Sequence, residues 1–286
     1  MADDVTLAKR YRAQRWLGTA GLHILCGAVA VACLFPLAWM FSSSLKTQDT
    51  VFSNYHLIPK TPHLENYILA WTQGHFGTYF FNSVWYTFWV VAGVVAIASL
   101  AAYAFSRLTF PGKNFFFYLL LATMMVPVPG SFVPLYVLLN ELGLINTRLG
   151  YILPQINGGL ALAIFLFKTF FDKIPRELEE SAKVDGCSRF GVFWHVALPL
   201  ARPAMAVVVI FTALAAWNEY LLAFLVFSSK ELMPLQRGLM VFQGAHITQY
   251  PLLMAGMIIS IIPIVAVYLV MHKHIIKGVM AGALKA

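Results

Sequence analysis

Residues 83–105 read SVWYTFWVVAGVVAIASLAAYAF and contain no charged side chain. Because an α-helix rises about 1.5 Å per residue, a run of about 20 apolar residues is long enough to cross a bilayer. The composition agrees with this prediction, since 60% of the 286 residues are hydrophobic and only 11% are charged. Soluble domains carry nearer a quarter of charged residues. We therefore predict an all-α, polytopic membrane protein.

The rest of the chain contains further apolar runs of similar length. The run from Leu17 to Met40 is too long for the apolar core of a signal peptide, so we expect it to remain as a membrane helix. The predicted domain at 17–272 lies between terminal segments at 1–16 and 273–286. Its six predicted transmembrane helices are Leu17–Phe41, Ser83–Phe105, Asn114–Leu139, Leu149–Phe170, Pro203–Val226 and Leu252–Met271.

The third predicted span contains residues that disfavour a regular helix, namely Pro127, Pro129, Gly130 and Pro134. Proline removes a backbone donor and clashes with the preceding turn, so we predict that this span is kinked or broken. A break is tolerated at membrane depth only where protein or a water-filled path satisfies the freed backbone groups.

Lysine and arginine are unequally distributed between the two sets of loops. With the N-terminus in the cytoplasm, 15 of the 20 basic residues lie on the cytoplasmic side and five on the other side. This is the bias that orients membrane proteins, and it predicts a multi-pass protein of the cell (inner) membrane with both termini in the cytoplasm. The formal net charge of +8 is explained by this orientation and does not indicate a nucleic-acid partner.

No metal site is indicated by the spacing of possible ligands. The three histidines of the predicted outside loop at 42–82 have no ligand pattern, and we interpret them as solvated loop residues. The three cysteines also fit no metal pattern, and their odd number argues against a disulfide framework.

The predicted cytoplasmic loop at 171–202 contains a short helix outside the membrane. Pro175 can begin a helix, acidic residues follow near the positive end of the helix dipole, and Gly186 can end it. We predict a helix over Glu177–Val184, followed by an amphipathic run over Ser188–Val196. The segment is either a plain connection or a rigid helix that docks to a cytosolic partner, and its mixed charge favours docking.

The same loop resembles the EAA loop of binding-protein-dependent ABC importer permeases. The family pattern is Glu-Ala-Ala, three residues, Gly, nine residues, an aliphatic residue, any residue and Leu-Pro. The chain departs from it once, where a small serine replaces the first alanine. The resemblance implies that the loop is the ATPase-coupling site. The matching residues are Glu180, Ser181, Ala182, Asp185, Gly186, Val196, Leu198 and Pro199.

Other motifs resemble the carbohydrate-uptake, maltose permease-like branch, and together they extend the likeness over nearly the whole chain. Examples are Phe35-Pro36, the run at 43–46, Asn82-Ser83, the run at 105–107 and the run at 217–220. The likeness implies a heterodimer with a second permease subunit, two cytosolic ATPase subunits and an extracytoplasmic solute-binding protein.

The resemblance also implies how the complex works. The short loop helix sits in a groove of an ATPase subunit, and ATP-driven closure of the ATPase dimer tilts the spans from an inward-facing to an outward-facing state. ATP and Mg²⁺ are expected in the partner subunits, because this chain lacks the phosphate-binding pattern Gly-x-x-x-x-Gly-Lys-Ser/Thr. We therefore expect a transport component without catalytic residues or a cofactor of its own.

Polar residues within the spans are candidates for the solute path. An ionisable side chain is costly in lipid, so it is functional by default. Glu219 is the clearest case, beside Asn218 and Tyr220. It either lines the path or outer gate, or bonds a neighbouring subunit near the interface. Gln155 and Asn157 in the fourth span are further candidates.

Three alternatives stay open at this point. An ABC importer for a non-sugar solute, such as glycerol phosphate, would carry the same coupling loop. An ion-coupled secondary transporter often shows inverted repeats and several buried charges, but the sequence has no clear repeat and little charge within the spans besides Glu219. A membrane-embedded enzyme would need His, Asp or Glu clustered at membrane depth, and the sequence shows no such cluster.

Overall fold

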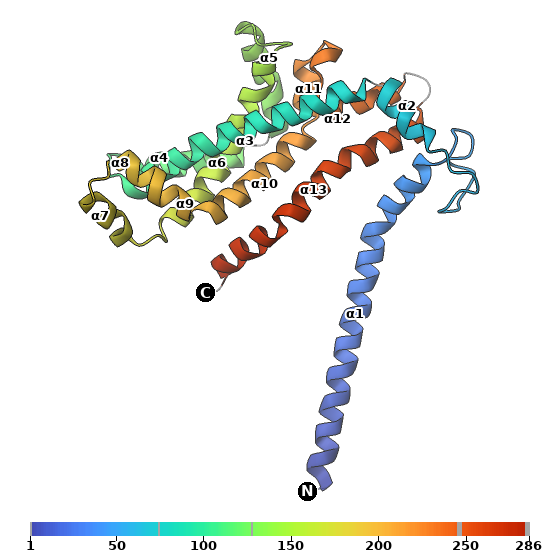
Figure 1. The fold of residues 1–286 in the computed structure, drawn as a ribbon, viewed down its shortest axis with the longest axis horizontal. Helices are drawn as coiled ribbons and strands as arrows, with labels where there is room; N and C mark the ends of the chain where they lie inside the picture. The colour runs from blue at the N-terminus through green and yellow to red at the C-terminus, as the bar shows by residue number, and fades with distance from the viewer. Residues whose placement is uncertain (1, 74, 127, 245–247, 284–286) are drawn as a thin grey trace. The chain divides into compact units, whose positions relative to one another are not determined.

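The computed structural model describes the backbone of residues 2–73, 75–126, 128–244 and 248–283. Within these ranges the regular structure is helical, apart from one isolated antiparallel bridge between Gln243 and Thr248. This confirms the predicted all-α fold (Figure 1). The helices are α1 (Ala2–Ser44), α2 (Glu65–Gln73), α3 (Phe76–Arg107), α4 (Lys113–Ala122), η1 (Thr123–Met125), α5 (Val128–Glu141), α6 (Arg148–Phe171), α7 (Arg176–Val184), α8 (Arg189–Val192), η2 (Phe193–Ala197), α9 (Leu198–Leu200), α10 (Arg202–Asn218), α11 (Leu221–Val226), η3 (Lys230–Leu232), α12 (Leu235–Gly238), η4 (Leu239–Phe242) and α13 (Tyr250–Ala283).

The chain forms two compact units. The first consists of Met1–Ala70 with Phe242–Ile258, and the second of Trp71–Val241 with Ile259–Ala286. The first unit contains α1, in which Thr19–Ser44 is apolar enough to cross a membrane, with a mean hydropathy of 2.3. Side chains 19–38 of α1 are exposed, so this helix requires an apolar environment such as a bilayer.

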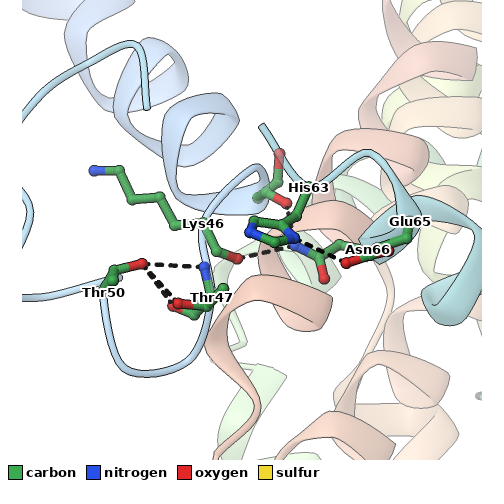
Figure 2. Close-up of polar contacts among 7 residues, drawn as sticks. Lys46, Thr47, Thr50, His63, Glu65 and Asn66 are labelled. Carbon is green, nitrogen blue, oxygen red and sulfur yellow. Dashed lines mark hydrogen bonds and ion pairs between the residues drawn. The ribbon is translucent and has the colours of Figure 1, made fainter. Parts of the chain in front are cut away.

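A polar cluster in the first unit fixes the chain directly after α1 (Figure 2). The side-chain amide of Asn66 donates hydrogen bonds to the carbonyl oxygens of Ser44 at 2.8 Å and Lys46 at 2.9 Å. Lys46 is 1% exposed, and its ammonium group donates to the carbonyl oxygen of Asn54 at 2.7 Å. Burial lowers the pKa of Lys46. These contacts order the end of α1 at Ser44 and the turn at 45–46 that follows it.

Three long helices, α3, α6 and α10, lie side by side in the second unit (Figure 1). A spacing of four residues keeps side chains on one face of a helix, and α3 packs such a stripe into the core. Gly159 of α6 lies against this stripe, where an added Cβ atom would come within 3.0 Å of Val94. The small residue therefore lets the two helices approach closely. The stripe, with each member at most 1% exposed, is Tyr86, Val90, Val94, Ala98 and Ala102.

The described residues contain four continuous helices that are long and apolar enough to cross a membrane, and six such spans if each of two bent helix pairs counts as one. The continuous spans correspond to the first, second, fourth and sixth predictions: Thr19–Ser44, Phe76–Arg107, Arg148–Phe171 and Tyr250–Leu269. The bent pairs are Lys113–Met125 with Gly130–Glu141, at 108°, and Arg189–Leu200 with Arg202–Asn218, at 75°. The terminal segments predicted at 1–16 and 273–286 are helical as far as they are described, because α1 begins at Ala2 and α13 ends at Ala283.

The break predicted in the third span is confirmed. Val126 is extended, with φ −77° and ψ 123°, which is the conformation that a following proline favours. Pro127 itself lies outside the described residues. Pro134 lies inside α5, which continues past it, so this proline does not interrupt the span as the sequence suggested.

The fifth predicted span is not one helix from Pro203 to Val226. Its first helix, α10, ends at Asn218, and Glu219 is extended at φ −70° and ψ 115° before α11 begins. The carboxylate of Glu219 accepts a hydrogen bond from the backbone N–H of Leu222 at 2.8 Å. An acidic side chain in this position satisfies a free donor at a helix start, which allows a new helix to form after the break.

Candidate functional site

The predicted helix of the coupling loop, α7, has a defined beginning and end. Pro175 stands at its N-cap, and Gly186 follows it with φ +87°. The N–H of Gly186 donates to the carbonyl of Lys183, and the N–H of Cys187 donates to the carbonyl of Ala182, both at 3.0 Å. This is the Schellman motif, which needs a left-handed residue at the glycine position. The predicted helix is confirmed, with a start one residue earlier than expected.

One face of α7 is open to solvent. Glu180, Ser181 and Asp185 are exposed, and Ala182 is half-buried. Val184, at the last turn, is 88% exposed. The residues of α7 that match the EAA pattern therefore present a small acidic surface, beside the apolar side chain of Val184, that a second protein can reach.

The opposite face of α7 carries a buried ion pair that the sequence patterns did not predict. Arg107, the last residue of α3, donates from Nε to Oε1 of Glu179 at 2.6 Å, and the two side chains are 9% and 5% exposed. The hydroxyl of Tyr103 donates to Oε2 of Glu179 at 3.2 Å. Arg107 also donates from Nη2 to the carbonyl oxygen of Ile174 at 2.8 Å. These contacts hold α7 against the end of α3.

A second polar group joins the end of α6 to α3. Asp172 accepts hydrogen bonds from the hydroxyl of Ser106 at 2.5 Å and from the ammonium group of Lys168 at 2.7 Å. Partial burial acts to raise the pKa of Asp172, but the hydrogen bonds from Lys168 and Ser106 and the charges of Lys168 and Arg107 outweigh it. The pKa of Asp172 is therefore lowered, and its carboxylate is ionised at neutral pH.

The amphipathic run after Gly186 forms α8, η2 and α9. Val192 and Phe193 are buried, and the Phe193 ring lies 5.2 Å from the Tyr103 ring, centre to centre. Leu198 and Pro199, which end the EAA pattern, are half-buried. The buried side chains of this part of the loop therefore anchor α7 to the helices behind it, while Phe190 and Trp194, at 64% and 56% exposed, add apolar surface beside α7.

Two of the five candidate solute-path residues, Glu219 and Gln155, contact Tyr151, which is 0% exposed. Its hydroxyl donates to the carbonyl oxygen of Glu219 at 3.1 Å, and its own carbonyl accepts from Nε2 of Gln155 at 2.9 Å. Asn218 and Tyr220 flank Glu219 at the break between α10 and α11. Because the carboxylate of Glu219 caps α11, this residue has a structural role that neither sequence-based reading anticipated.

Two further observations concern α6. The side-chain oxygen Oε1 of Gln155 is buried and has no hydrogen-bond partner among the described residues. A buried acceptor without a donor is unusual, so this oxygen is a candidate acceptor for water or for a solute hydroxyl. Asn157 is exposed on α6, and no contact among the described residues joins it to Tyr151 or Glu219.

A separate groove of about 550 Å³ lies between α3, η2 and α10. Its walls are almost entirely apolar, with Phe88, Trp194 and Met205 among them. Ligand sites for polar molecules need a few well-placed polar groups. This groove therefore lacks the chemistry for a sugar and is not part of the candidate path.

The segment after α11 is fastened to the beginning of α3 by neutral side chains. The amide of Asn82 donates to the carbonyl oxygens of Glu231 at 2.7 Å and Met233 at 3.0 Å. The hydroxyl of Tyr86 donates to the carbonyl oxygen of Leu232 at 2.8 Å. These three bonds pin η3 and the following turn to α3.

The contact continues into α12. The hydroxyl of Ser83 accepts from the backbone N–H of Leu235 at 2.8 Å, so it caps the start of that helix. Gly238, at the end of α12, lies against the buried ring of Tyr79, where an added Cβ atom would clash. Only a residue without a side chain permits this approach.

Comparison with known proteins agrees with this geometry. The family described as "Binding-protein-dependent transport system inner membrane component" matches residues 94–280. The chain is 36% identical over 274 residues to the "Probable ABC transporter permease protein YurM" of Bacillus subtilis (strain 168), covering 96% of this chain and 91% of that protein. It is 32% identical over 265 residues to the "Diacetylchitobiose uptake system permease protein NgcG" of Streptomyces coelicolor, covering 92% and 88%.

A third relative and a solved structure extend the likeness. The chain is 33% identical over 267 residues to the "Trehalose/maltose transport system permease protein MalG" of Thermococcus litoralis, covering 92% of this chain and 96% of that protein. A chain in the crystal structure of a bacterial ABC transporter involved in the import of the acidic polysaccharide alginate matches with a TM-score of 0.79 and 27% identity, covering 92% of this chain and 97% of that chain. The chain belongs to the family of inner-membrane components of binding-protein-dependent transport systems and is an ABC importer permease.

Proposed function

We propose that this chain and a second permease subunit form the path by which a sugar or oligosaccharide crosses the inner membrane. An external binding protein delivers the solute. The carbohydrate class is supported by relatives named for diacetylchitobiose and for trehalose/maltose, and by the likeness to an alginate importer. ATP and Mg²⁺ are bound by two cytosolic ATPase subunits, since this chain has no phosphate-binding loop.

The coupling helix α7 docks to one of the ATPase subunits. The observation that carries this proposal is that α7 is ordered at both ends, exposed on one face and tied to α3 by the other. An element with these properties can receive a force on its open face and pass it to the membrane helices. The proposed coupling residues are Glu180, Ser181, Ala182, Asp185, Gly186, Leu198 and Pro199.

The proposed orientation in the membrane rests on the distribution of basic residues. With six spans, 15 of the 20 Lys and Arg residues fall in the segments on the same side as α7 and the termini. This bias supports a cytoplasmic position for α7. Closure of the ATPase dimer on ATP then moves α7 and opens the path to the outside, and hydrolysis resets it.

The proposed solute path passes the break between α10 and α11, with Asn218, Glu219 and Tyr220 at the break and Gln155 and Asn157 on α6. A broken span is tolerated where protein or a water-filled cavity satisfies the freed backbone groups, and discontinuous helices form solute sites in other transporters. The unpaired buried oxygen of Gln155 supports this assignment, because a hydroxyl of a sugar can donate to it.

The docking proposal is tested by cysteine cross-linking in the assembled complex, after the three native cysteines are replaced. We expect Ser181→Cys to cross-link to an ATPase subunit and to react with a membrane-impermeant maleimide only from the cytoplasmic side. Ser228→Cys is the matched control, since Ser228 is also exposed but lies after α11. It should react only from the outside. Cross-links of Ser181→Cys to no ATPase subunit, or labelling of it from outside the cell, would contradict the proposal.

A further inference from the structure

The buried face of α7 carries one acidic side chain, and this side chain is the centre of a connection to α3. Glu179 is 4% exposed, in contrast to its neighbour Glu180, which is exposed. Both of its oxygens are used, one by Arg107 and the other by Tyr103. These two donors lie one helical turn apart at the end of α3, so both bonds of the Glu179 carboxylate join α7 to the same core helix.

Burial makes this connection stiff. Charge-assisted hydrogen bonds are shorter and stronger than neutral ones, and the 2.6 Å contact between Arg107 and Glu179 is of this kind. Separating a buried pair leaves an uncompensated charge away from water, which is strongly unfavourable. A displacement of α7 therefore moves Arg107 with it instead of breaking the pair.

Because α3 packs against two other long helices, a force on its end can reach all three. Arg107 is the last residue of α3, and α3 packs along both α6 and α10 in the second unit (Figure 1). Its buried stripe runs from Tyr86 to Ala102, so a pull at Arg107 acts on the whole layer of three helices. The other ion pair nearby, Lys168 with Asp172, joins residues four apart at the end of α6 and is partly exposed. It does not reach α7.

We propose that the buried pair of Arg107 and Glu179, supported by the hydroxyl of Tyr103, is the positioning contact through which movement of α7 is transmitted to α3. The inference rests on the proposed docking of α7 to an ATPase subunit. It assigns to these three residues the role of keeping α7 and α3 one rigid body throughout the ATP cycle.

The test measures whether α7 and α3 stay at a fixed distance when the ATPase subunits change state. Spin labels are placed at Arg176 of α7, which is outside the proposed coupling residues, and at Ile97 of α3, both exposed, in the assembled complex without the native cysteines. The distance between the labels is compared in the nucleotide-free state and in the state trapped with ATP and vanadate. In the otherwise unchanged chain it should be the same in both states. With Glu179→Gln it should change between the states by more than about 2 Å, the scale that separates rearrangement from local adjustment.

The matched control is Glu177→Gln, which removes the same charge from an exposed position on the same helix. It should leave the distance fixed. Reversal of the pair, Arg107→Glu with Glu179→Arg, should restore the fixed distance that Glu179→Gln loses. Tyr103→Phe removes one hydrogen bond and no charge, so it keeps the fold intact and should give a smaller change in the same direction.

A fixed distance in both Glu179→Gln and Tyr103→Phe would overturn the inference. If Glu179→Gln fails to assemble, a fixed distance in Tyr103→Phe alone overturns it, and a change in Tyr103→Phe supports it. Failure of the docking proposal is recognised separately, because Ser181→Cys then forms no cross-link with an ATPase subunit in any variant.

Discussion

The second unit is fastened in different ways at the two ends of α3. At the α7 end, which comprises Arg107, Glu179 and α7, charged side chains from distant parts of the chain meet each other. At the α12 end, which comprises Asn82, Tyr86 and the segment 230–238, neutral side chains donate to backbone carbonyl oxygens. The contacts at the α7 end therefore depend on side-chain charge, and those at the α12 end depend on where the backbone of a loop runs.

The two kinds of contact should respond differently to mutation. A buried ion pair responds sharply when either partner is lost, because the remaining charge is stranded. A hydrogen bond from an amide to a carbonyl contributes only about 0.5–1.5 kcal/mol net, so an anchored loop tolerates the loss of one bond. We therefore expect substitutions at the α7 end to change both stability and coupling, and those at the α12 end to change mainly local stability.

The largest effect on stability is expected for Arg107→Ala. It leaves the carboxylate of Glu179 buried with Tyr103 as its remaining donor, and loss of one partner from a buried pair costs about 3–5 kcal/mol. Thermal unfolding of the purified complex would measure it. Lys173→Ala is the control, since Lys173 is an exposed cation in the same loop. Equal unfolding temperatures for the two variants would contradict the assignment of Arg107 as the anchor of this end.

A smaller effect is expected for Gly238→Ala at the α12 end. The added methyl group would clash with the buried ring of Tyr79, and overpacking of this kind costs about 1–3 kcal/mol. Gly158→Ala on α6 is the control, because nothing lies within 4 Å of its Cβ position. A second substitution, Tyr79→Leu, should relieve part of the clash. If Gly238→Ala and Gly158→Ala unfold at the same temperature, α12 does not pack on Tyr79 as described.

Two glycines separate the role of the turn that ends α7 from the general cost of a strained turn elsewhere in the second unit. Gly186, after α7, and Gly143, between α5 and α6, have φ of +87° and +66°, and neither has an atom within 4 Å of its Cβ position. A β-branched residue is strained in this conformation by about 1–2 kcal/mol. Gly186→Val and Gly143→Val should therefore lose similar stability.

Only Gly186→Val should uncouple the complex, because it alters the turn that ends α7. The measurement is the cross-linking yield from Ser181→Cys to an ATPase subunit, together with the rate of ATP hydrolysis. A lower yield in Gly186→Val and an unchanged yield in Gly143→Val are expected. Equal yields in both would show that the end of α7 is not part of the docking surface.

The sequence predicts α7 well because local chemistry determines both of its ends. A proline at the first turn and a glycine in the left-handed region are signals that can be read without knowing the fold, and the apolar runs of the long spans are equally local. The break of the third span was also readable, since proline restricts the residue before it and Val126 is extended.

The contacts between helices could not be predicted from local sequence in this way. Arg107 and Glu179 are 72 residues apart in sequence, and each has a sufficient local explanation, as a basic flank of a span and as an acidic residue near a helix start. The break at Glu219 was missed for a related reason. The apolar residues resume after Tyr220, so the run resembles one span, and only the bond from the Leu222 N–H to the Glu219 carboxylate shows where a second helix begins.

The smallest effect is expected for Lys168→Ala, which removes the partly exposed pair with Asp172 at the end of α6. The side chains of Lys168 and Asp172 are 23% and 44% exposed, and helix pairs spaced by four residues contribute only about 0.3–0.5 kcal/mol. Because salt screens exposed charges far more than buried ones, the loss of unfolding temperature in Lys168→Ala should diminish at high salt, whereas that in Arg107→Ala should persist. Equal losses of unfolding temperature in the two variants, with the same salt dependence, would contradict this prediction. The stability of the α7 end would then depend on its overall charge and not on the burial of the pair of Arg107 and Glu179.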